Sequence, residues 1–71
     1  MERDFERKCI ICLKNQDWNA LDNISTEHLE ATEGRSYKGF LYLGISLYKL
    51  GDYESAIRAF TKAEQINSDD A

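Results

Sequence analysis

The chain has 71 residues, of which 42% are hydrophobic and 31% charged, and its formal net charge is −4. The hydrophobic content is too high for a disordered segment, and the length allows one small domain with a thin core. Nine basic residues against thirteen acidic ones exclude an ordinary nucleic-acid surface, which requires concentrated positive charge. The sequence has no apolar run of about 18 residues and no secretory leader pattern. We therefore expect a protein of the cytoplasm or nucleus with no membrane partner.

The first predicted helix covers about residues 3–15. Its basic residues alternate with acidic ones, which is typical of surface pairing. Cys9 and Cys12 have the CxxC spacing of zinc and redox sites, but they lie within the helix and no second pair of ligands accompanies them. We expect two reduced thiols packed in the core, with no metal and no other cofactor.

The second predicted helix covers about residues 18–31 and has a less regular apolar pattern. His28, near its end, has no acidic or nucleophilic companion at helical spacing, so we expect a solvated or partly packed histidine and not a catalytic one. Gly34 can stop this helix, and Ser36 can cap the next one. The carboxylates are scattered and no glycine-rich phosphate loop is present, so the sequence indicates no enzyme.

The third and fourth predicted helices, at about residues 37–50 and 53–67, have the clearest pattern. Gly44 and Ala56 lie on the faces that would meet, and the absence of bulk there lets two helices approach closely. Gly51 can close the third helix in the left-handed conformation, and Asp52 can cap the fourth. The pattern predicts an antiparallel hairpin with Phe60 packed in its middle.

A degenerate copy of this hairpin precedes it, visible when the chain is shifted against itself by 35 residues, from Phe5 to Phe40. Other aligned pairs in the first helix and its corner are Cys9 with Gly44, Asp17 with Asp52 and Trp18 with Tyr53. In the second helix Ser25 falls on Phe60, whereas a rotation by one residue would place Ile24 there instead. The chain is therefore expected to contain two related hairpins.

The pattern resembles the tetratricopeptide repeat, a helix-turn-helix unit of about 34 residues with an aromatic, Leu-Gly, Tyr, Ala, Phe, Ala order. The residues that carry it are Phe40, Leu43, Gly44, Gly51, Tyr53, Ala56, Phe60 and Ala63, with Leu47 where the first Tyr usually stands. The resemblance implies an all-α fold, in which two antiparallel helical hairpins stack as a short α-solenoid. It implies one domain over residues 1–71, with repeat one at 2–36 and repeat two at 37–70, and a non-catalytic module for protein-protein interaction.

In this family the first helix of each repeat lines a concave groove. The family's groove positions imply that the peptide-binding residues here are Ile10, Leu13, Lys14, Lys38, Leu41, Ile45, Tyr48 and Lys49, with Arg3 and Glu6 at the remaining positions. We call its apolar members the apolar strip: Ile10, Leu13, Leu41, Ile45 and Tyr48. The strip suits an amphipathic helix or an extended apolar peptide carrying acidic residues, bound by a scaffold or adaptor subunit. A later helix of the same protein, or a second copy, would fit it equally well.

One subtype of the family does not fit. Repeats that clamp the acidic tails of heat-shock chaperones place Asn after the small residue of the first helix, with a basic residue four positions earlier. Ile10 and Ile45 stand in place of that Asn, preceded by Glu6 and Leu41. The resemblance therefore implies apolar contact and no carboxylate clamp.

The end of the chain resembles a junction between repeats, with Ala71 as the first residue of a third one. We expect an N-terminal segment of a longer protein; the alternative is a complete small protein that hides its open end in an oligomer. Ile11 has no apolar counterpart at Ser46, which points to a mate for the first helix. A homodimerisation element of a multi-subunit assembly is therefore the second hypothesis for function.

Overall fold

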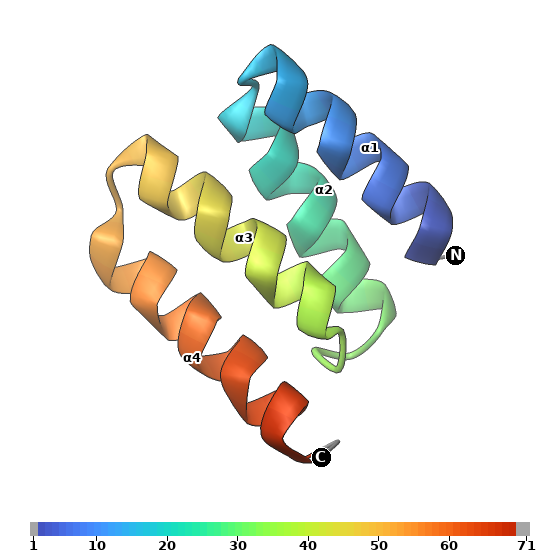
Figure 1. Ribbon diagram of the computed structural model, residues 1–71, viewed down its shortest axis with the longest axis vertical. Helices are drawn as coiled ribbons and strands as arrows, with labels where there is room; N and C mark the ends of the chain where they lie inside the picture. Colours follow the sequence, from blue (N-terminus) through green and yellow to red (C-terminus); the bar gives the residue numbers. More distant parts are fainter. Residues whose placement is uncertain (1, 70–71) are drawn as a thin grey trace.

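The computed structural model describes residues 2–69, which form four helices: α1 (Glu2–Asn15), α2 (Trp18–Ala31), α3 (Tyr37–Leu50) and α4 (Tyr53–Asp69). Each helix runs antiparallel to the one before it and packs against it, so the two hairpins stack in chain order (Figure 1). The predicted all-α stack of two hairpins is confirmed. The expectations for Asp70 and Ala71, including the start of a third repeat, lie outside the described residues.

The helices begin at short polar capping residues and end at residues with a left-handed backbone conformation. Ser36 caps α3 with its Oγ, which accepts a hydrogen bond of 3.0 Å from the Gly39 N–H. Gly51 ends that helix with φ 91°, as its place in the sequence predicts. At the equivalent corner of the first hairpin Gln16 has φ 57°, a conformation that costs a side chain about 1–2 kcal/mol. The first corner is therefore the more strained of the two.

The buried core belongs mainly to the first hairpin. Its fully or nearly fully buried members are Phe5, Cys9, Cys12 and Leu21. Tyr42 and Ile45 of α3 pack against this cluster, so they join the second hairpin to the first. Both cysteines are buried, as predicted for packed core residues. Burial, with a smaller effect of the neighbouring Cys12, raises the pKa of the Cys9 thiol to about 12.

Helix contacts in the two hairpins use different pairs of side chains at equivalent positions. Between α3 and α4 the Phe60 ring lies against Gly44, whereas between α1 and α2 both Cys9 and Ser25 are fully buried. Ser25, which is aligned with Phe60, is fully buried, and Ile24 packs against the core cluster as a partly buried neighbour. Both residues therefore lie on the packed side of α2.

Candidate peptide-binding groove

Two residues of the apolar strip are structural. Leu13 on α1 and Ile45 on α3 are partly buried, and both pack against the core cluster. Nearby, the Phe5 and Tyr42 rings meet edge to face, with centroids 5.8 Å apart and an interplanar angle of 81°. The ring contact joins α1 to α3, and Leu13 and Ile45 are packed residues that offer little surface to a ligand.

Two of the three other strip residues are exposed. Ile10 is 45% exposed and Tyr48 is 55% exposed, while Leu41 is partly buried. Single exposed apolar residues are common on protein surfaces, but here an aliphatic and an aromatic side chain stand on the two helices to which the resemblance assigns the groove. Ile10 and Tyr48 are therefore the exposed members of the strip.

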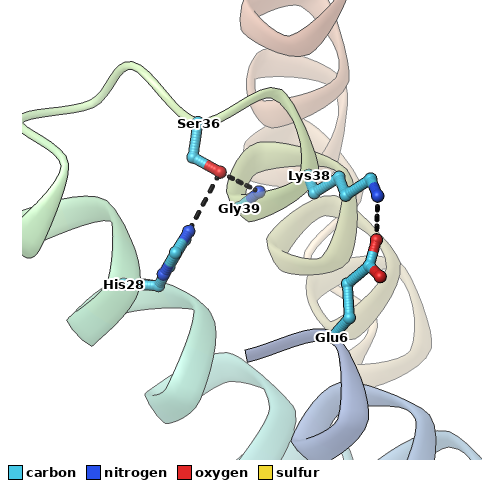
Figure 2. Close-up of polar contacts among 5 residues, drawn as sticks. All are labelled: Glu6, His28, Ser36, Lys38 and Gly39. Carbon is cyan, nitrogen blue, oxygen red and sulfur yellow. Dashed lines mark hydrogen bonds and ion pairs between the residues drawn. The ribbon is translucent and has the colours of Figure 1, made fainter. Parts of the chain in front are cut away.

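The basic residues along the strip have different surroundings. Lys38, at the start of α3, forms an ion pair with Glu6 of α1, and Figure 2 shows the two side chains pointing at one another. Glu6 stands at one of the family's groove positions, and its carboxylate pairs with Lys38 in this structure. The pair balances the positive charge of Lys38 at this end of the groove.

The carboxyl ends of α1 and α3 combine positive charge with aromatic rings. The Lys49 Nζ lies 5.6 Å from the centroid of the Trp18 ring and 6.0 Å from that of Tyr48. The Tyr48 and Tyr53 rings are tilted at 60° with centroids 5.3 Å apart. Lys14, in the last turn of α1, is exposed. The family positions did not include Trp18 and Tyr53, although their alignment across the repeats marks both as corner residues.

His28 lies at a junction of three helices. Its ring stacks on Phe5 of α1 with centroids 3.8 Å apart and an interplanar angle of 5°. A hydrogen bond of 3.1 Å joins its Nε2 to Ser36 Oγ, the same oxygen that caps α3 (Figure 2). His28 is therefore a partly packed residue that links the hairpins, which agrees with one of the two environments expected for it.

The comparison with known families decides the nature of the second hairpin. A family model described as the tetratricopeptide repeat matches residues 37–70. Residues 37–70 are a tetratricopeptide repeat. Such repeats generally mediate protein-protein interaction and are typically non-catalytic modules. No curated protein and no solved structure matches the chain.

Helices α1 and α2 precede the matched segment. Their likeness to the repeat rests on the alignment of the two halves of the chain and on the four-helix arrangement. Among the described helices, none is long and apolar enough to cross a membrane. Within the same part of the chain, no group of three or more His, Cys, Asp or Glu residues could hold a metal ion.

Proposed function

We propose that this tetratricopeptide-repeat chain is the binding segment of a scaffold or adaptor subunit of the cytoplasm or nucleus, and that it holds a peptide between α1 and α3. One observation carries the proposal: Ile10 and Tyr48 remain about half exposed on these two helices, although Leu13 and Ile45 beside them are packed. An exposed aromatic and an exposed aliphatic residue on a rigid support are suitable anchors for a partner side chain.

The charges along the groove favour one class of peptide. At one end Lys38 is balanced by Glu6, whereas the other end carries Lys14 and Lys49. Lys14 and Lys49 stand in the last turns of α1 and α3, just before the helix caps Asp17 and Asp52. We therefore infer that the ligand is apolar in its middle and carries Asp or Glu where it meets the carboxyl ends of α1 and α3.

A peptide-display selection against the 71-residue chain tests this function. We expect enriched sequences to contain one or two large apolar residues flanked by acidic residues. Fluorescence anisotropy with an enriched peptide then compares the wild type with Ile10→Ser and Tyr48→Ser. Each variant should weaken binding about 10- to 100-fold, the usual effect of losing an apolar anchor.

Ile11→Ser is the matched control for Ile10→Ser. Ile11 is 51% exposed, close to the 45% of Ile10, but helical geometry turns it away by about 100°. The Ile11→Ser variant should therefore bind the peptide with the same affinity as the wild type. Equal loss in both variants, or enrichment of basic and polar peptides, would contradict the proposed groove.

A further inference from the structure

A second exposed apolar surface lies on the outer side of α3 and α4. We call it the open face: Tyr48 on α3, with Tyr53, Ile57 and Phe60 on α4. Their exposed fractions are 55%, 59%, 64% and 36%. On α4 these positions recur three and four residues apart, so they form one continuous stripe. The stripe is distinct from the groove, which lies between α1 and α3, although Tyr48 borders both.

The equivalent side of the first hairpin can be compared with the open face. The residues equivalent to Tyr48, Tyr53 and Phe60 are Leu13, Trp18 and Ser25. Leu13 packs with the core cluster, Ser25 is fully buried, and Lys49 of α3 lies over the Trp18 ring. On this side of the first hairpin, α3 therefore reaches over Trp18. The same side of the second hairpin has a more apolar surface and no covering helix among the described residues.

The area of the open face can be compared with the area that a small protein-protein interface buries. Buried aromatic side chains contribute about 150–250 Å² each, so the exposed parts of these four residues amount to about 400 Å². Two such faces, together with the polar atoms around them, approach the roughly 1,000–1,200 Å² of a small specific interface. The largest apolar patch on a typical soluble monomer covers about 300–600 Å² and is often functional.

The charges around the open face allow contact with an identical face. Arg58 and Lys62 lie beside Ile57 on α4, and Lys49 lies beside Tyr48 on α3. Glu54 and Glu64 stand about one turn from Ile57 and Phe60 on the same helix. Charges of both signs therefore lie along the stripe, so two identical faces can offer each other opposite charges.

The outer face of α1 is poorly suited to pack against the open face of another copy. Helix α3 docks on α2 through Gly39, where a Cβ would lie 2.8 Å from Leu29 Cδ2. The equivalent residue in α1 is Asp4, a charged side chain that would prevent the same close approach. Continuous head-to-tail stacking of copies is therefore disfavoured, which leaves contact between two identical faces.

We propose that two copies of this chain associate open face to open face in a twofold dimer, with α4 packed against α4 of the other copy. The dimer buries the open face of both copies, and its symmetry closes the contact at two chains.

Sedimentation equilibrium of the 71-residue chain from about 1 μM to about 1 mM tests the dimer. The expected result is a transition from the 8.2 kDa chain to twice that mass. Ile57→Glu should weaken the association by about 100-fold or more, because the twofold axis places the change in the interface twice. Ile57 is 64% exposed, so the variant should keep its helices, which circular dichroism checks.

Ile11→Glu on α1 is the matched control, since Ile11 is also about half exposed. It should dimerise like the wild type. A second variant, Ile57→Cys, should form a disulfide-linked dimer on mild oxidation, because a twofold contact brings equivalent residues together while Cys9 and Cys12 stay buried. A wild-type monomer at about 1 mM would overturn the dimer. If Ile57→Cys crosslinked only to the Ile11→Cys variant and not to itself, the twofold arrangement would be wrong and a head-to-tail contact would be indicated. The same holds if Ile11→Glu, and not Ile57→Glu, abolished the dimer.

Discussion

The Phe60 ring of α4 lies directly against the backbone of Gly44 in α3. A Cβ atom at residue 44 would lie 2.7 Å from Cε1 and 2.8 Å from Cδ1 of the ring, closer than carbon atoms can pack. Helix α3 therefore has a glycine in its interior because the neighbouring helix places an aromatic face there. The ring is still 36% exposed, since its far side belongs to the open face.

The first prediction concerns this contact. Replacing an interior helical Gly by Ala normally stabilises a helix by about 0.5–1 kcal/mol. Here Gly44→Ala should instead destabilise the chain by about 1–2 kcal/mol, because the added methyl group displaces the ring. Urea unfolding measures the change. In a Phe60→Leu background the loss should shrink, since the smaller side chain can move aside. A net gain from Gly44→Ala in the wild type would show that the ring is not held there.

The second prediction uses the two corners. Gln16 and Gly51 stand at equivalent places and both have positive φ, but only Gly51 adopts it without a steric cost. Gln16→Gly should therefore stabilise the chain by about 0.5–1 kcal/mol, and Gly51→Ala should destabilise it by about 1 kcal/mol. In a domain of this size, melting temperatures should move in opposite directions by about 2–8 °C. If Gln16→Gly lowers the melting temperature, the glutamine side chain makes a contact that outweighs its backbone strain.

The four helices and their ends could be predicted from the sequence because local signals determine them. Gly51, Asp52 and Ser36 act within a few residues of where they stand. The finer structure of the groove depends on how residues from different helices meet. Nothing near Ile45 in the sequence distinguishes a residue that packs on the core of the other hairpin from one that faces a ligand. The pairing of Lys38 with Glu6, more than thirty residues away, was missed for the same reason.

The third prediction concerns the junction between the hairpins. Ser36 is 93% buried, and its Oγ both accepts the Gly39 N–H and is bonded to His28 Nε2. Ser36→Ala removes the cap of α3 and leaves the imidazole without this partner, so we expect a loss of about 1–2 kcal/mol in urea unfolding. Ser36→Thr, which keeps the hydroxyl, is the control and should retain most of the stability. Equal effects of both variants would indicate a packing defect and no role for the hydrogen bonds.

The fourth prediction concerns alkaline pH. Burial raises the pKa of the Cys9 thiol from 9.0 to about 12, so the folded chain keeps the proton after the unfolded chain has lost it. The unfolded state then binds fewer protons than the folded state, and stability falls as pH rises from about 9 towards 12. Urea unfolding at pH 8, 9 and 10 should show this decline. Cys9→Ala should flatten it, although the raised pKa values of Cys12 and Tyr42 leave part of the slope. Identical slopes in the two proteins would refute the assignment to Cys9.

The last prediction separates charge from apolar contact in the groove. Lys14 is exposed, and reversing its charge with Lys14→Glu should slow the association of an acidic peptide several-fold and reduce its dependence on salt, while the dissociation rate changes little. Tyr48→Ser should act in the opposite way, through faster dissociation, because it removes a contact and not a long-range attraction. Lys49→Glu is a less clean test, since Lys49 also lies over the Trp18 and Tyr48 rings. Stopped-flow binding at about 50 and about 200 mM salt, within the range where screening changes strongly, resolves the two rates. If Lys14→Glu accelerates dissociation more than Tyr48→Ser does, the ligand is held chiefly by charge, and the apolar anchors assigned to the groove are wrong.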